Sequence, residues 1–310
     1  MAVSNYSEVT FFTLSGFANH PDLQVSLFLM FLFIYLFTVL GNLGLIMLIR
    51  SDSQLHTPMY FFLSNLAFID LLYSSTITPK SLVNFLSNQK TISFVGCFVQ
   101  MYFFVGLVCS EYFLLGSMAY NRYVAICNPL LYSVVMSQKV CSWLGTMPYV
   151  IGFTDSLISI CVISSLTFCD SSINHFFCDT LALLALPCVD AFSTQMVIIV
   201  LAGFTIFSSL LIITLTYIAI ISAILKIQSA EGRQKAFSTC TSHLMGVTIF
   251  YGSLIFTYLQ PDNTSSLTQA QVASVFYTIV IPMLNPLIYS LRNKVVKNAL
   301  LRVTQRKQFL

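Results

Sequence analysis

Seven long runs of apolar residues alternate with short polar segments, and these runs constrain the fold more than any other feature of the chain. A helix needs about 20 apolar residues to cross the hydrocarbon of a bilayer, where its backbone polar groups must be satisfied internally. The runs are approximately Leu23–Ile49, Pro58–Pro79, Cys97–Tyr120, Val140–Ser164, Phe192–Leu225, Ala236–Gln260 and Leu267–Leu291. We therefore predict an all-α membrane protein, a seven-transmembrane helix bundle.

The composition agrees with lipid as the surrounding medium. Hydrophobic residues make up 57% of the 310 residues and charged residues only 8%, whereas a soluble domain has about 25% charged residues. The net charge is only +3, so nucleic acid is not an expected partner.

The positions of Lys and Arg predict the orientation. Of the 14 basic residues, all except Lys80 and Lys90 lie on one side of the predicted bundle, and the side rich in Lys and Arg is normally cytosolic. We expect a single domain over residues 1–310, with an extracellular N-terminus (1–25) and a cytosolic tail (292–310) that contains a short eighth helix. Asn5-Tyr6-Ser7 then lies outside as a predicted glycosylation site.

The nine cysteines divide by compartment. The four on the predicted outer side, where oxidation is permitted, allow three disulfide pairings, and their spacing does not choose among these. These four are Cys97, Cys169, Cys178 and Cys188. The other five lie within helices or near the cytosol and should stay reduced, namely Cys109, Cys127, Cys141, Cys161 and Cys240.

Several motifs lie at fixed places in the predicted helices. The third run ends in Asn121-Arg122-Tyr123, and an Arg at the membrane edge is costly unless it anchors the helix or has a function. The seventh run ends in Asn285-Pro286 and Tyr289, where the proline frees a carbonyl and bends the helix. Gly41-Asn42, Asp70 and Trp143 mark the first, second and fourth runs.

In this order, these elements resemble the rhodopsin-like G-protein-coupled receptors. Four segments resemble signatures of the odorant receptor family: Pro58–Ser64, Met118–Cys127, Lys235–Leu244 and Pro282–Asn293. The resemblance implies that the chain is a receptor and not an enzyme. It implies that a small odorant activates a stimulatory, olfactory-type heterotrimeric G protein, which raises cAMP. It also implies that the protein resides in the plasma membrane of olfactory cilia and that trafficking chaperones help it to reach the surface.

The resemblance assigns a switch at the cytosolic end. Arg122 would engage the G protein when the sixth helix moves outward, while Tyr217 and Tyr289 would help to hold the open state. The family usually has Asp before this Arg, and here the residue is Asn121, which lacks the charge that would pair with Arg122. The full predicted set is Asn121, Arg122, Tyr123, Tyr217, Asn285, Pro286 and Tyr289.

Asp70 and Glu111 should lie at one depth on neighbouring helices, given a rise of about 1.5 Å per residue. Two carboxyl groups in low dielectric must share a proton or hold a cation. The resemblance implies a sodium ion here, with Asn285 nearby; a protonated structural pair is the alternative. We expect no other cofactor.

A ligand pocket is predicted in the outer half of the bundle, where residues at helical spacing coincide with the ligand positions that the family implies. Each alone is more often a residue of ordinary helix packing than a ligand contact. They are Phe104, Val105, Val108, Cys109, Tyr112, Leu201, Thr205, Tyr251, Leu254, Ile255, Tyr258, Ser274 and Thr278.

The predicted lining is apolar, apart from hydroxyls and a thiol. By this resemblance, Phe104 stands at the position where amine receptors have an Asp. The upper part of the predicted sixth helix carries no basic residue. At about 25 cal/mol per Å² of buried apolar area, less association costs, a small volatile should bind with micromolar or weaker affinity. We expect neutral, moderately hydrophobic odorants.

Two further features follow from the resemblance. It implies the disulfides Cys97–Cys178, from the third helix to the outer loop, and Cys169–Cys188, within that loop. Tyr251 occupies the place of a Trp switch found in other rhodopsin-like receptors, with no nearby proline to bend the helix.

Other classes of protein fit less well. An enzyme would need a recognised ligand or catalytic spacing, which His56, Asp70, Glu111, Asp155 and His243 do not form. A transporter would be expected to show paired broken helices or internal symmetry. A rhodopsin-like receptor for another small molecule, outside olfaction, is the remaining alternative.

Overall fold

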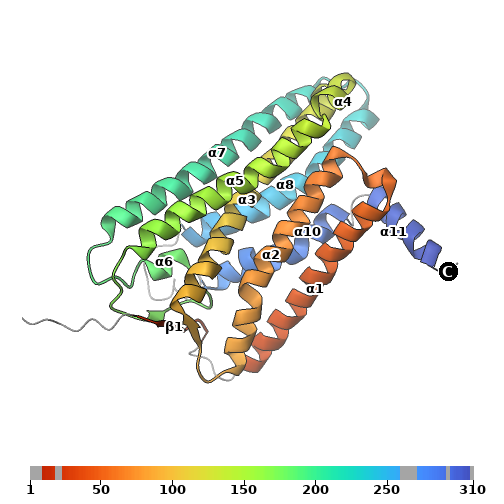
Figure 1. Cartoon of the computed structure of the whole chain (residues 1–310). Helices are drawn as coiled ribbons and strands as arrows, with labels where there is room; N and C mark the ends of the chain where they lie inside the picture. Colours follow the sequence, from red (N-terminus) through yellow and green to blue (C-terminus); the bar gives the residue numbers. More distant parts are fainter. Residues whose placement is uncertain (1–8, 18–22, 259–270, 291–293, 308–310) are drawn as a thin grey trace, which may run out of the picture.

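The structure is a computed structural model that describes residues 9–17, 23–258, 271–290 and 294–307, without the side chains of 256–258, 290, 294 and 303–307. Long helices dominate it (Figure 1). They are α1 (Gln24–Ser51), α2 (Pro58–Leu86), α3 (Phe94–Cys127), α5 (Gln138–Ser164), α7 (Phe192–Leu225), α8 (Ala230–Tyr258) and the seventh span (Gln271–Tyr289), which includes the π-helical turn η4 (Phe276–Val280) and most of α10 (Ile281–Ser290).

Among the described residues, six of these helices are long and apolar enough to cross a membrane. The exception is α8, whose apolar run is interrupted by polar residues such as Thr241, Ser242 and His243. It nevertheless packs against α3, α7 and α10 within the same bundle. The seven long helices therefore form the predicted all-α architecture.

Three of the predicted runs, the second, third and fourth, are shorter than the helices that contain them. Helix α2 continues past Pro79 to Leu86, and α3 extends at both ends beyond the predicted Cys97–Tyr120. Apolar composition marks only the part of a helix within hydrocarbon, whereas the helix itself can continue into the polar region. The run Phe192–Leu225 agrees with α7; residues 259–270 and 291, at the ends of the last two runs, lie outside the described residues.

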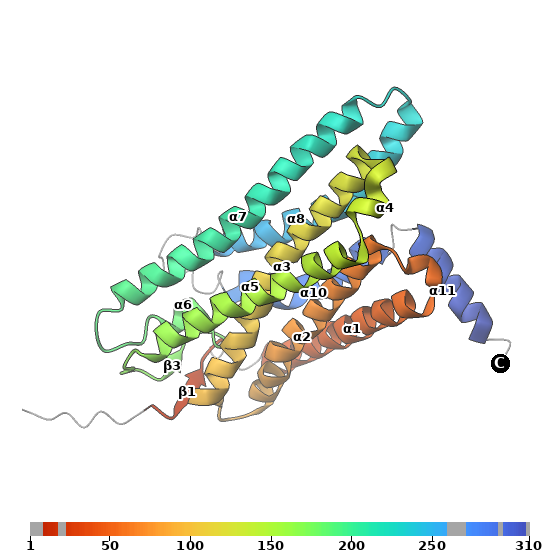
Figure 2. The same ribbon diagram turned by 45° about the horizontal axis from the view of Figure 1, so that its top comes forward.

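Helix α3 is the centre of the bundle. It contacts α2, α5, α7 and α8, and Figure 2 shows it passing between α2 and α7. Close approach to α5 depends on Gly152, where an added Cβ would lie 2.4 Å from the Gly106 carbonyl oxygen. Residues of α3 that face the interior of the bundle are consequently buried among several helices.

Pro286 leaves a backbone carbonyl without its usual donor inside the seventh span. Because proline has no N–H, the Pro282 carbonyl cannot receive the helical hydrogen bond from position 286. The fully buried Asn42 of α1 supplies it: its Nδ2 donates to the Pro282 oxygen at 3.0 Å and to Thr38 of its own helix at 2.9 Å. The motifs Gly41-Asn42 and Asn285-Pro286 are thus coupled physically.

A small sheet covers the end of the bundle opposite the C-terminal helix α11 (Lys294–Lys307) (Figure 1). Strand β1 (Phe11–Leu14) pairs antiparallel with β2 (Thr91–Ser93) and parallel with β3 (Ser172–Ile173). Every second residue of β1 is buried, with Phe12 and Leu14 at 0% and 2% exposure. The N-terminal segment predicted merely as extracellular is therefore an integral part of this cover.

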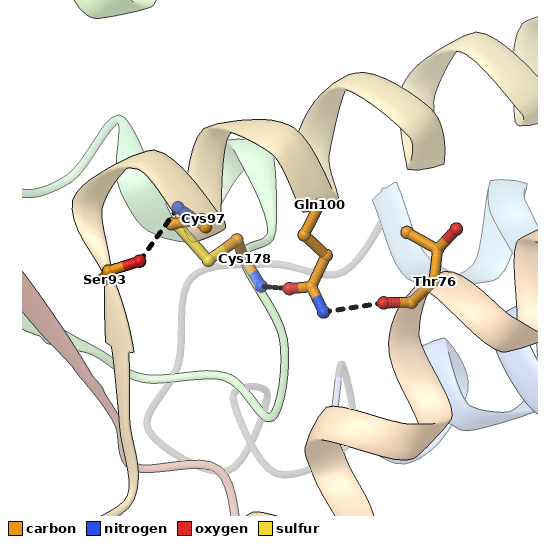
Figure 3. The surroundings of a disulfide bond; sticks show 6 residues. Thr76, Ser93, Cys97, Gln100 and Cys178 are labelled. Carbon is orange, nitrogen blue, oxygen red and sulfur yellow. Dashed lines mark hydrogen bonds between the residues drawn. A yellow bond between two sulfur atoms is a disulfide. The ribbon is translucent and has the colours of Figure 1, made fainter.

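Two disulfides fasten the loop that contributes β3: Cys97–Cys178 and Cys169–Cys188. These are the bonds that the family resemblance implies. Beside the first, the Gln100 side chain of α3 accepts a hydrogen bond from the Cys178 backbone N–H at 3.0 Å and donates to the Thr76 carbonyl of α2 at 3.0 Å (Figure 3). Gln100 thereby joins two helices and the loop at one point.

At the other end, short segments connect the long helices: η2 (Ser53–Leu55) after α1, and η3 (Pro129–Leu131) with α4 (Tyr132–Val135) after α3. The amphipathic α11 is tied to the first connection, since Arg302 forms an ion pair with Asp52 at 2.7 Å. This is the short C-terminal helix that the tail was predicted to contain.

We predict that Gly16→Ala loosens the sheet cover. A Cβ at this position would lie 2.3 Å from the Phe176 backbone nitrogen and 2.5 Å from the His175 carbonyl carbon, and backbone atoms cannot easily move aside. Overpacking of this kind costs about 1–3 kcal/mol. Thermal unfolding of the purified receptor should show a lower Tm, with faster hydrogen exchange in β1.

The matched control is Gly44→Ala in α1, where no atom lies within 4 Å of the added Cβ. Its Tm should equal or slightly exceed that of the wild type, because Ala favours helix over Gly by about 1 kcal/mol. Equal Tm values for Gly16→Ala and wild type would contradict the predicted steric role.

Candidate functional site

The predicted ligand face of α3 points into the bundle. Phe104, Val108, Cys109 and Tyr112 are buried and Val105 is half-buried. Phe104 stacks on Tyr73 of α2, with ring centroids 5.3 Å apart, and meets Phe177 of the loop at 4.9 Å. Three aromatic rings in contact thus join α3, α2 and the loop that contributes β3.

The predicted residues on the other helices divide into two groups. Thr205, Tyr251, Leu254, Ser274 and Thr278 are buried, and Leu201 is half-buried. Ile255 is 48% exposed and does not join the buried group; the Tyr258 side chain lies outside the described residues.

Tyr251 connects three helices. Its hydroxyl donates to Ser209 Oγ of α7 at 2.8 Å, and its ring lies 5.3 Å from that of Tyr112 on α3. Movement of α8 at this level must therefore alter its contacts with both α7 and α3.

Asp155 binds two of the predicted ligand-lining residues, a role that the sequence analysis did not assign to it. It lies well inside α5, is 8% exposed, and accepts hydrogen bonds from Thr205 Oγ1 at 3.0 Å and Cys109 Sγ at 3.3 Å. The lining therefore includes a carboxyl group in addition to hydroxyls and a thiol. An acid within the otherwise uncharged run Val140–Ser164 was the available signal.

His175 joins the cover to the seventh span. It is 7% exposed, and its Nε2 lies 3.1 Å from Ser274 Oγ. Burial lowers the pKa of the imidazole, against the opposing effect of the nearby Asp179 carboxylate, so the ring is neutral near pH 7. Gln271 adds a second link, as its Nε2 donates to the Asn174 carbonyl at 2.9 Å.

A carboxyl pair occupies the middle of the bundle. Asp70 and Glu111 are 0% and 2% exposed and are close enough to interact electrostatically. The Asn285 amide donates to both oxygens of Asp70 at 3.0 and 3.2 Å and also interacts with Glu111. The three residues predicted to lie together are thus brought together from α2, α3 and α10.

The predicted switch residues lie at the end of the bundle nearer α11. Arg122 donates a hydrogen bond to the Thr239 carbonyl, which holds α3 against α8. The Tyr217 hydroxyl lies 2.8 Å from Nδ1 of the fully buried His243, whose Nε2 lies 3.1 Å from the Leu115 carbonyl. These hydrogen bonds link α3, α7 and α8 at this end of the bundle, and we call this set of contacts the closed arrangement.

Asn121 is linked to the connection after α3. Its Oδ1 accepts a hydrogen bond from the Tyr132 hydroxyl at 2.9 Å, and its Nδ2 lies 3.6 Å from Met59 Sδ of α2. The neighbouring Tyr123 is half-buried, while Pro286 and Tyr289 of the seventh span are buried.

Comparison with known proteins identifies the family of the chain. A family model described as "Olfactory receptor" matches residues 31–307. The human protein Olfactory receptor 8I2 is 85% identical over 309 residues, which cover 100% of both chains. The chain belongs to the olfactory receptor family. Human Olfactory receptor 8H1 is 58% identical over 99% of each chain, and mouse Olfactory receptor 8G50 is 54% identical over 100% of this chain and 99% of the relative.

The fold is also that of a rhodopsin. The crystal structure of squid rhodopsin matches with a TM-score of 0.71 and 18% identity, covering 90% of this chain and 80% of that one. The predicted seven-transmembrane receptor fold is thereby confirmed. As an olfactory receptor, the chain is a multi-pass membrane protein and not an enzyme, and its family implies an odorant ligand and a G-protein partner.

The predicted glycosylation site Asn5 lies outside the described residues. His175 and Gln100 were also not predicted, because polar residues in a loop or helix carry no local mark of the distant partners that give them their roles.

Proposed function

We propose that this olfactory receptor binds small, neutral, hydrophobic odorants between α3, α7, α8 and the seventh span. The buried face of Phe104, Val108 and Tyr112 carries the proposal, because it offers apolar and aromatic surface to a ligand within the bundle. None of the predicted lining residues is basic, so an acidic ligand would lack a cationic partner there.

Ligand binding would activate a stimulatory, olfactory-type G protein and raise cAMP. Arg122 now holds α3 to α8 through the Thr239 carbonyl, and outward movement of α8 would free its guanidinium for the G protein. The excess of Lys and Arg at the α11 end supports a cytosolic location for this end and an extracellular N-terminus. We also propose residence in the plasma membrane of olfactory cilia, reached with the help of trafficking chaperones.

The first test measures cAMP in cells that express the receptor and the olfactory stimulatory G protein. Neutral volatiles should raise cAMP with half-maximal concentrations in the micromolar range or above, since a small apolar ligand gains only a few kcal/mol after association costs. Arg122→Ala at equal surface expression should abolish the response. Activation by amines or acids alone, or flat cAMP with every volatile, would refute the proposed function.

We further predict that Asn121→Asp lowers ligand-free cAMP. Asn121 keeps hydrogen bonds to Tyr132 and Met59 but cannot form an ion pair with Arg122, which Asp would add to the closed arrangement. A charge-assisted contact of about 1 kcal/mol would reduce basal activity roughly fivefold.

The matched control for this substitution is Asn298→Asp, on the exposed side of α11. It makes the same chemical change away from Arg122 and should leave basal cAMP unchanged. The hypothesis fails if wild type and Asn121→Asp show the same basal cAMP at equal surface levels.

We also propose that the carboxyl pair binds sodium. Two fully buried carboxyl groups with an amide between them are the hard oxygen donors that such an ion takes. Asn285 now directs its N–H group at Asp70, so it would have to turn its amide oxygen inward to contribute a ligand. A bound cation would balance the buried charge and hold α2, α3 and α10 together.

Glu111→Gln should therefore abolish the effect of sodium on the agonist dose–response curve. The comparison replaces sodium by an organic cation at constant ionic strength, in wild type and in Glu111→Gln. Glu231→Gln, at the exposed start of α8, is the control and should retain the sodium effect. A sodium effect of the same size in Glu111→Gln would disprove the site.

A further inference from the structure

The two oxygens of the Asp155 carboxyl group have different surroundings. Oδ2 accepts both protein hydrogen bonds, from Thr205 and Cys109. Oδ1 is equally enclosed, yet it has no hydrogen-bond partner among the described residues. A buried acceptor without a donor lowers the stability of the folded protein by about 1–3 kcal/mol. A ligand that donates a hydrogen bond to this oxygen would remove that cost.

The position of this oxygen links it to the ligand pocket. Asp155 lies where α5 meets α3 and α7, and both of its donors belong to the predicted ligand-lining residues. Tyr112 lies one helical turn from Cys109 on the same face of α3, and its ring meets those of Phe250 and Tyr251 at 5.2 and 5.3 Å. The carboxyl group is therefore bonded to a residue that lies one helical turn from this group of aromatic rings.

The two donors are already engaged. A thiol and a hydroxyl each carry one hydrogen, and those of Cys109 and Thr205 both point at Oδ2. Neither can donate to a ligand at the same time. With both hydrogens directed at Oδ2, Oδ1 is the acceptor that remains for an O–H or N–H donor.

We propose that Oδ1 of Asp155 anchors the odorant and selects hydrophobic alcohols. This inference rests on the proposed function, because it places the ligand in the same pocket. An alcohol supplies one O–H donor without bringing a charge into the bundle, whereas an ammonium ion must lose its full hydration. An aldehyde or an ether has no hydrogen to donate.

The experiment compares straight-chain alcohols from hexanol to decanol with their aldehydes, methyl ethers and primary amines. In wild-type receptor, each active alcohol should have a half-maximal concentration about tenfold below that of its aldehyde or ether, which corresponds to about 1.4 kcal/mol. cAMP is read in the same reporter cells, with surface expression measured in parallel.

Asp155→Asn should reverse this order. Cys109 and Thr205 both donate toward one side, so the amide oxygen of Asn should face them and its NH₂ group should take the place of Oδ1. The anchor then becomes a donor, and the aldehydes should become at least as potent as the alcohols. Asp190→Asn, the same change in an exposed loop, should keep the wild-type order.

Three results would overturn the inference: aldehydes as potent as alcohols in wild type, activation by amines or other volatiles but not by alcohols, or an unchanged order in Asp155→Asn at equal surface level. If Asp155→Asn does not reach the surface, the wild-type order decides. Failure of the proposed function has a different outcome, namely flat cAMP with every compound of a broad volatile panel.

Discussion

The absence of water within a bilayer is the constraint on which the rest of this structure depends. Each backbone carbonyl or buried polar side chain must find its partner inside the protein. The bond from Asn42 to the Pro282 carbonyl shows the consequence: a proline that bends the seventh span is tolerated because another helix supplies the missing donor. Several serines and threonines likewise donate to the carbonyl four residues earlier, as Thr278 does to Ser274.

The same constraint gives weight to the carboxyl groups that are buried within the bundle. Asp70, Glu111 and Asn285 form a buried cluster in the middle of the bundle, and one carboxyl oxygen of Asp155 has no partner among the described residues. In a soluble protein, water could hydrate such groups at moderate cost. Inside a membrane bundle they are expensive, so each is a natural place for an ion or a ligand to contribute to stability and selectivity.

The extracellular and cytosolic ends that we propose are built differently. One is closed by a sheet, two disulfides and the links from Gln100 and His175, which together hold the cover to α2, α3 and the seventh span. The other depends on a few hydrogen bonds between α3, α7 and α8, such as that from Arg122 to Thr239. The end around the proposed ligand site is cross-linked, and the other end is less constrained. Such a bundle can transmit ligand binding by moving one helix.

The sequence by itself determined the medium, the number of long helices, their approximate positions and the family, because hydropathy and motif spacing are local properties of the chain. Only the tertiary structure showed that β1 completes the cover, that Ile255 lies on an exposed face and that Asp155 joins Cys109 and Thr205, which are 46 and 50 residues away. Partners so distant are set by how helices pack and rotate against one another. No periodicity within a single helix encodes that geometry.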